Sequence, residues 1–434
     1  MRPVRDGPPL APAPLRMPVA LREFLRAETA GGAVLMIAVA LALVWANSPW
    51  RGAYDALWRT VLELRLGRFG LAGDLREWVN EGLMALFFLV VGLEIKRELV
   101  DGELRTWRQA ALPVVAAAGG MLIPAAIYAA LNARGPGAAG WGVPMATDIA
   151  FALGVLALLG PRVPAALKLF LLALAIVDDL GSILVVALFY SGELRPPALA
   201  LAAVLVLAIL GLRRARIYWT PLYVAAGIGL WLALHAAGVN AALAGVAMGL
   251  LASARPVTHP ETLHHTSRTL DSAPGPAWLR DVLREVRGTV STAERLQHGL
   301  HPISAFLVVP VFALANAGVT VHAGALSGRG APLVLAGVIA GRVLGKPAGI
   351  LLAVWLALRL RLGVWPAGAS WRQLAGVATV AGIGFTVPLF VAGLAFPGGA
   401  FEAAVKLGLL LASVVAGLAG VMVLRGARPA EPPS

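Results

Sequence analysis

The stretch ALAIVDDLGSILVVALFY, residues 173–190, places two adjacent aspartates, Asp178 and Asp179, in an otherwise apolar segment. The segment is long enough to cross a bilayer as a helix, which needs about 20 predominantly apolar residues. One charged side chain at the centre of a bilayer costs about 2.5–3.5 kcal/mol on insertion scales. Two neighbouring carboxylates in such a place therefore point to a function that uses them.

The composition of the whole chain is typical of a membrane protein. Of its 434 residues, 59% are hydrophobic and only 14% are charged, with a mean hydropathy of +0.80, whereas a soluble domain carries about 25% charged residues. The formal net charge is +13. The basic residues gather between apolar runs, as the positive-inside rule describes, so they do not indicate a nucleic-acid partner. The chain has no cysteine, which excludes disulfides and thiolate metal sites.

Apolar segments of spanning length recur along the chain and predict an all-α polytopic membrane protein of about 12 transmembrane helices. They lie near residues 30–47, 82–99, 109–131, 143–160, 167–190, 196–212, 219–236, 239–253, 302–321, 332–358, 373–396 and 401–424. Basic residues concentrate in alternate connections, which predicts a cytoplasmic location for these connections and for both termini.

The predicted organisation follows from these spans. It consists of a disordered or interfacial N-terminal segment (1–27), spans 1–8 (28–253), a long cytoplasmic loop (254–301), spans 9–12 (302–424) and a cytoplasmic tail (425–434). Between the first two spans, VLELRLGRFGLAGDL (61–75) alternates apolar and polar residues around Gly67. This pattern predicts an external β-hairpin near 57–75. Its unpaired edges suit strand addition between two copies of the chain.

Few other ionisable residues lie within the predicted spans. Among them are Asp148 in the fourth span, Lys346 in the tenth and Glu94 near the inner end of the second. Adjacent residues of a helix point about 100° apart, so one of the two neighbouring aspartates can face an ion path while the other meets Lys346. A single buried charge is often a structural ion pair, but several at similar depth typically mark ion or proton paths.

Two spans carry the signals of broken helices. GWGVPMATDIAFA (140–152) places Gly142, Pro144 and Thr147 before Asp148, and VATVAGIGFTVPLF (377–390) places four such residues, Gly382, Gly384, Thr386 and Pro388, in mid-span. Irregular backbone at membrane depth is tolerated where protein or a water-lined cavity covers it, which predicts a binding site at the two breaks. The alternative is that these residues only permit kinks or close packing.

Several functions use carboxylates inside a membrane. Oxygen ligands suit a hard alkali cation and also bind a proton, so one site that holds either is the basis of a cation/proton antiporter. An intramembrane aspartyl protease is disfavoured because its two aspartates lie on different helices. A passive cation channel is disfavoured because the sequence lacks a repeated filter or carboxylate ring. A proton-coupled carrier of an organic solute remains the alternative.

Six ordered blocks of this sequence resemble the signatures of NhaA-type sodium/proton antiporters. The blocks are LFFLVVGLEIKREL (86–99), MATDIAFALGVLALLG (145–160), LAIVDDLGSI (174–183), HPISAFLVVPVFALANAGV (301–319), GKPAGI (345–350) and AGIGFTVPLF (381–390). The resemblance extends from about residue 20 to 425. It implies a fold of twelve helices, in which spans 3–5 and 10–12 form an inverted repeat with two discontinuous helices, and a dimer that uses the external hairpin.

The resemblance also implies an activity and a set of site residues. The activity is electrogenic, pH-regulated export of Na+ and Li+ in exchange for H+ at the bacterial inner membrane, with no cofactor and no enzymatic reaction. The implied ion- and proton-binding residues are Asp178, Asp179, Asp148, Thr147 and Lys346, with Asp178 and Asp179 as the metal ligands. The backbone of the discontinuous helix is implied at Gly382, Gly384 and Thr386, and the pH response at Glu94, Arg97 and Glu98.

Three positions depart from the family pattern. Asn240 and Gln297 stand where the family type has a histidine and a glutamate, and both replacements remove a titratable group. Arg342 is an additional intramembrane cation four residues before Lys346, a like-charge spacing that is unfavourable on a helix. We expect Arg342 to pair with a carboxylate.

Overall fold

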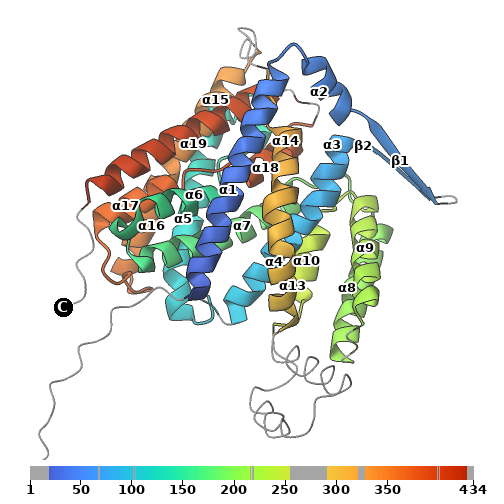
Figure 1. Cartoon of the computed structure of the whole chain (residues 1–434), viewed down its shortest axis with the longest axis horizontal. Helices are drawn as coiled ribbons and strands as arrows, with labels where there is room; N and C mark the ends of the chain where they lie inside the picture. Colours follow the sequence, from blue (N-terminus) through green and yellow to red (C-terminus); the bar gives the residue numbers. More distant parts are fainter. Residues whose placement is uncertain are drawn as a thin grey trace, which may run out of the picture.

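The structure, a computed structural model, describes residues 19–66, 69–100, 102, 104–215, 217, 219–254, 291–320, 328–397, 399 and 401–427. Most of this part of the chain is helical, and its one sheet has two strands. Figure 1 shows the helices gathered in one bundle, with the two strands projecting from it. We call the end of the bundle that carries the strands the hairpin end.

The first half of the chain supplies the central helices of Figure 1 and the pair α8 and α9 at one side. Its helices are α1 (Val19–Ala46), α2 (Arg51–Trp58), α3 (Leu75–Trp78), α4 (Met84–Val100), α5 (Trp107–Asn132), α6 (Ile149–Leu158), α7 (Ala165–Phe189), α8 (Pro196–Arg214), α9 (Thr220–Ala236) and α10 (Leu243–Leu251). A π-helical turn (Val79–Leu83) precedes α4, and 3-10 turns (Ala138–Gly142 and Gly160–Arg162) flank α6.

The second half packs mainly at the opposite side of the bundle (Figure 1). Its helices are α13 (Thr292–Ile303), α14 (Val309–Asn316), α15 (Ala331–Ala340), α16 (Lys346–Arg359), α17 (Trp371–Val380), α18 (Thr386–Ala395) and α19 (Glu402–Arg425). π-helical turns join α13 to α14 (Ser304–Val308) and α15 to α16 (Gly341–Gly345). The predicted span 196–212, for example, is helical from Pro196 to Arg214.

Six helical segments of the described chain are long and apolar enough to cross a membrane. They are Trp107–Asn132, Ala165–Phe189, Pro196–Arg214, Thr292–Asn316, Ala331–Arg359 and Glu402–Arg425. A seventh is added if Ala30–Ala46 of α1 and Arg51–Trp58, between which the chain bends by 115°, are counted as one span. The helices α6, α9 and α18 are shorter and apolar. The chain is therefore a helical multi-pass membrane protein, whereas the count of about 12 spans stays a prediction.

Some of the predicted segments fall on residues that the structure does not describe. These are 1–18 of the N-terminal segment, 255–290 of the long loop and 428–434 of the tail. Residues 19–27, also assigned to the N-terminal segment, form the first turns of α1.

Glycines let pairs of helices approach closely. A Cβ atom at Gly119 of α5 would lie 2.4 Å from the carbonyl oxygen of Gly349 of α16, and one at Gly249 of α10 would lie 2.7 Å from the carbonyl oxygen of Leu89 of α4. Small residues at helix contacts are typical of membrane bundles, in which packing rather than the exclusion of water holds helices together.

The predicted β-hairpin is confirmed. Strands β1 (Val61–Leu66) and β2 (Phe69–Asp74) pair antiparallel, with Val61 opposite Asp74. The predicted turn residue Gly67 lies outside the described residues. Asp74 ends the sheet and caps α3, because its side chain accepts a hydrogen bond from the main-chain N–H of Glu77 at 2.7 Å. No third strand of the described chain pairs with the sheet.

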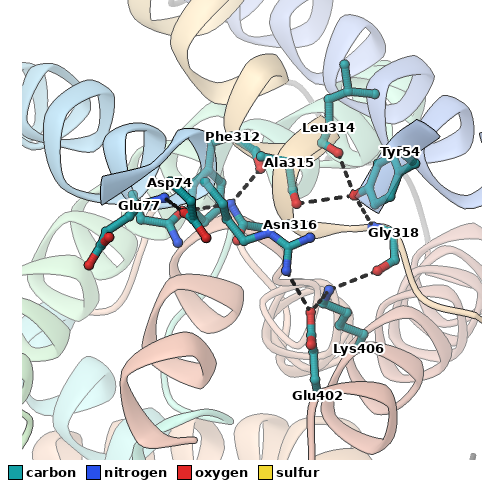
Figure 2. Close-up of polar contacts among 12 residues, drawn as sticks. Tyr54, Asp74, Glu77, Phe312, Leu314, Ala315, Asn316, Gly318, Glu402 and Lys406 are labelled. Carbon is teal, nitrogen blue, oxygen red and sulfur yellow. Dashed lines mark hydrogen bonds and ion pairs between the residues drawn. The ribbon is translucent and has the colours of Figure 1, made fainter. Parts of the chain in front are cut away.

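A polar network at the hairpin end of the bundle ties α2 to the end of α14 (Figure 2). The hydroxyl of Tyr54 donates to the carbonyl oxygen of Leu314 at 2.8 Å and accepts from the N–H of Gly318 at 3.2 Å. Buried Tyr54 thus satisfies main-chain groups that the helix end leaves without a partner.

The same network continues into α19 (Figure 2). Lys406 is buried, donates to the carbonyl oxygen of Gly318 at 2.9 Å and forms an ion pair with Glu402. A guanidinium nitrogen of Arg76, on α3, lies 3.6 Å from the carboxylate of Glu402. Charged side chains therefore connect α3, the end of α14 and the start of α19.

Candidate functional site

Two chain breaks meet in the interior of the bundle. The first break, residues 143–148, precedes α6, and the second break, residues 381–385, joins α17 to α18. The N–H of Asp148 donates to the carbonyl oxygen of Ile383 at 3.0 Å, and the hydroxyl of Thr147 donates to that of Ala381 at 2.9 Å. These hydrogen bonds join segments that are more than 230 residues apart in the sequence.

Buried cations satisfy the carbonyl groups that the breaks release from helical bonding. Arg342 donates from Nε to the carbonyl oxygen of Gly382 at 3.0 Å and from Nη2 to that of Ala146 at 2.9 Å. Lys346 donates from Nζ to the carbonyl oxygen of Met145. A positive charge is favourable here, because unpaired carbonyls at the end of a helix carry partial negative charge.

Whereas the two cations bind carbonyl groups of the breaks, Asp148 lies at the N-termini of both helices that follow the breaks. Its Oδ1 accepts from the N–H of Phe151 in α6 at 3.3 Å. Its Oδ2 accepts from the N–H of Thr386 in α18 at 3.2 Å and from the Thr386 hydroxyl at 2.8 Å. One carboxylate thus satisfies amide groups at the positive ends of two helices.

Asp178 of α7 forms a buried ion pair with Lys346. Its Oδ2 lies 2.5 Å from Nζ of Lys346 and accepts a second hydrogen bond from the N–H of Thr147 at 2.8 Å. Lys346 is fully buried, so this pair is shielded from solvent and the loss of either partner would leave a buried charge.

Asp179 lies on a different face of α7 and borders a cavity of about 80 Å³. The cavity lining includes the carboxylates of Glu94, Asp148 and Asp179 and the side chains of Thr147, Ser304 and Thr386. Three buried oxygens of α7, Asp179 Oδ1, Asp178 Oδ1 and Ser182 Oγ, have no hydrogen-bond partner in the described part of the chain, and of these three residues Asp179 lines the cavity. Buried acceptors without partners are costly in a folded protein, so they indicate a place where a proton or a cation binds.

The ligands at this site favour a hard cation. Carboxylate and hydroxyl oxygens are the ligands that alkali and alkaline-earth cations prefer. Within the described residues, no group of three or more histidines, aspartates or glutamates is arranged to hold a metal ion.

The comparisons with known proteins agree with this geometry. The family described as Na+/H+ antiporter 1 matches residues 22–424. The chain belongs to this family of Na+/H+ antiporters. It is 47% identical over 426 residues to Na+/H+ antiporter NhaA 3 of Frankia alni, which covers 98% of this chain and 92% of that one. It is 46% identical to Na+/H+ antiporter NhaA of Oleidesulfovibrio alaskensis, which covers 97% of each chain.

A solved structure also shares the fold of this antiporter-family chain. The sodium proton antiporter MjNhaP1 of Methanocaldococcus jannaschii at pH 8 superposes with a TM-score of 0.52, covering 94% of this chain and 98% of that one. The identity is only 13%, so this likeness concerns the fold alone. The resemblance that the sequence motifs indicated is therefore confirmed at the level of the family.

The three residues expected to respond to pH in this family member all lie on α4. Glu94 borders the cavity and accepts from Nε2 of Gln297 at 3.5 Å. Arg97 and Glu98 lie on the last turn of α4 and pair with each other at 3.3 Å. Asn240, far along the chain, accepts from the N–H of Ala242 with its side chain.

The structure shows contacts that the sequence did not predict. Arg342 bonds to two carbonyl oxygens, and among the described residues it forms no ion pair, so the expected carboxylate partner was wrong. The only feature of the sequence that drew attention to Arg342 was its position within the tenth predicted span. Ser182 beside the aspartates and Lys406 of α19 are polar residues in apolar segments, but the sequence around them did not predict their surroundings.

Proposed function

We propose that this chain is a secondary transporter that exports Na+, and also Li+, in exchange for H+. The observation that carries the proposal is the difference between the two adjacent aspartates. Asp178 is bonded to Lys346, whereas Asp179 faces the cavity with an oxygen that lacks a partner among the described residues. A carboxylate in that position can hold a proton or an alkali cation, and each displaces the other.

The dimensions of the cavity favour an ion over a larger substrate. Its volume of about 80 Å³ is well below the roughly 300–1,000 Å³ of pockets that bind organic ligands. Na+ or Li+ would be held by Asp179 and Asp178 with help from the oxygens of Thr147 and Asp148. Transport of an organic solute and cleavage of a peptide are both disfavoured on this ground.

Alternating access supplies the transport step of the proposal. Na+ binds Asp179 from the cytoplasmic side, the helices that carry the breaks move against the remaining bundle, and protons replace Na+ at the outer side. Broken helices and inverted repeats recur in transporter folds of this kind, NhaA-type antiporters among them. The two breaks that meet at the site support a repeat of α5–α7 and α15–α19 within a fold of about 12 spans.

The proposed location is the bacterial inner membrane, with the hairpin end outside and both termini in the cytoplasm. The basic residues of alternate loops support this orientation. We also propose a homodimer that forms through the hairpin, whose strands have no further partner in the described chain, with lipid around the apolar helix surfaces.

Two further properties are proposed from the family resemblance. Exchange of more protons than sodium ions per cycle makes transport electrogenic, so the membrane potential contributes about 2.3 kcal/mol per net charge per 100 mV. Activity also responds to pH, through Glu94 beside the cavity and through the neighbouring pair of Arg97 and Glu98.

Exchange in everted vesicles tests the proposal. Respiration loads such vesicles with protons, and addition of Na+ or Li+ should dissipate the proton gradient when the chain is present. Asp179→Asn should abolish this response, whereas Asp55→Asn, which changes an exposed aspartate of α2, should retain it. A wild-type chain that gives no response to Na+ at any pH between about 6.5 and 9 contradicts the proposal.

A further inference from the structure

Arg342 is fully buried, and its hydrogen-bond partners are neutral groups. Its two hydrogen bonds go to carbonyl oxygens of Ala146 and Gly382, and Nη1 has no partner within the described residues. Burial of a guanidinium is costly unless hydrogen bonds compensate for the lost water, and at this position the compensation comes from carbonyl groups of the two breaks. The role of the arginine is therefore tied to the breaks.

The guanidinium connects the two breaks. Ala146 belongs to the first break and Gly382 to the second, and one planar group donates to both. A Cβ atom at Gly384 would clash with Nη2 of Arg342, so a glycine is required where the guanidinium enters the second break. Lysine has no planar fork of donors and would not reproduce this bridge.

The connection bears directly on the cavity. Thr147 and Asp148 follow Ala146, and Thr386 lies four residues after Gly382; all three border the same cavity as Asp179. The hydrogen bonds of Asp148 also depend on how the two breaks are placed relative to each other, because its Oδ2 accepts from Thr386, which follows the second break. Whatever fixes Ala146 against Gly382 therefore fixes the oxygens that face Asp179.

We propose that Arg342 is a positioning residue for ion exchange: it clamps the two chain breaks together and so holds the cavity oxygens at ion-binding distance from Asp179. Lys346 is then not needed as a clamp, since its Nζ bonds only to the first break and to Asp178. This division of roles explains why two cations four residues apart on one helix are both present. The inference rests on the proposed Na+/H+ exchange.

Two variants of Arg342 test the proposal in the full-length protein. Arg342→Met removes the bridge, and Arg342→Lys keeps the charge without the fork. The control is Arg359→Met, which changes an exposed arginine on α16 that stacks over Trp355. In proteoliposomes we expect Arg342→Met to raise the Na+ concentration for half-maximal exchange by about tenfold, the loss of roughly one charged hydrogen bond. Arg342→Lys should fall between this value and the wild type, and Arg359→Met should match the wild type.

Hydrogen–deuterium exchange gives a second readout that needs no transport. In Arg342→Met and Arg342→Lys, peptides that contain Asp148 and Thr386 should exchange faster, with other helices unchanged. The proposal is overturned if the variants keep the wild-type Na+ dependence of transport and the wild-type rate of deuterium exchange at both breaks. It is also overturned if deuterium exchange is faster throughout the bundle while the Na+ dependence of transport stays normal, because that result indicates general destabilisation.

If Arg342→Met does not fold, Arg342→Lys is judged by the same two measurements. A wild-type protein without Na+/H+ exchange refutes the proposed function, while the deuterium measurement still reports on the clamp.

Discussion

Lys346 and Asp178 form an ion pair in which neither side chain is reached by solvent: Nζ lies 2.5 Å from Oδ2, and the side chains are 1% and 0% exposed. The same Asp178 oxygen also accepts the N–H of Thr147. The pair therefore joins α7, the first break and the start of α16. Asp179, the next residue of α7, is left to face the cavity.

The ion pair predicts strong coupling between its two residues. Lys346→Met leaves the charge of Asp178 buried without its counterion, and Asp178→Asn does the same to Lys346, so each change should lower the free energy of unfolding by about 3–5 kcal/mol. The double variant should lose much less than the sum, because it buries no unpaired charge. Thermal unfolding of the four purified proteins measures this coupling. Additive losses would mean that the two residues do not interact.

Asp179 predicts the opposite combination of effects. Its Oδ1 has no hydrogen-bond partner among the described residues, so Asp179→Asn removes a charge without breaking a bond that the fold uses. The variant should unfold at or above the wild-type temperature while Na+/H+ exchange is lost. Thermal unfolding and vesicle exchange, measured on the same preparation, check both halves. A variant that is unstable but retains exchange would contradict this reading of Asp179.

Thr386 predicts a smaller effect at the meeting of the breaks. Thr386→Val removes the hydroxyl that donates to Asp148 at 2.8 Å and retains the main-chain hydrogen bond. The loss of one hydrogen bond is worth about 1 kcal/mol, so the Na+ concentration for half-maximal exchange should rise about fivefold. Thr379→Val is the matched control, because that hydroxyl donates only to Ala375 within α17. If the Na+ concentration for half-maximal exchange rises equally in both variants, the hydroxyl of Thr386 has no specific role at the ion site and the prediction is wrong.

The network at the hairpin end predicts an asymmetry between Glu402 and Lys406. The side chain of Lys406 is 4% exposed and that of Glu402 is 42% exposed. Glu402→Gln therefore leaves a buried cation without its counterion, whereas Lys406→Met leaves a carboxylate that water can solvate and that Arg76 approaches. Glu402→Gln should lower the unfolding free energy by about 1–3 kcal/mol, more than Lys406→Met. Thermal unfolding decides the order, and the reverse order would contradict the buried position of Lys406.

The sequence predicted the parts of this protein that depend on local patterns. Apolar runs mark the helices, alternation marks the hairpin, and charges in apolar segments mark Asp178, Asp179, Asp148 and Lys346. Glycine and proline mark both breaks, since irregular backbone within a span requires residues that tolerate it.

The remaining features depend on contacts between distant segments. The carbonyl groups that Arg342 binds belong to residues 196 positions before it and 40 positions after it, so its partners do not follow from its own surroundings in the sequence. The burial of Lys406 likewise follows from the meeting of α19 with the end of α14 at Gly318. Such contacts become visible only when the segments are placed in space.

Proton release on Na+ binding tests the central claim most directly. Purified protein in a weakly buffered solution is titrated with NaCl while the pH is recorded, with choline chloride as the control salt and Asp179→Asn as the control protein. If one carboxylate site holds either Na+ or H+, Na+ will release protons from the wild type, less so as the starting pH rises, and none from Asp179→Asn. Saturable Na+ binding to the wild type that releases no protons at any pH would contradict the account.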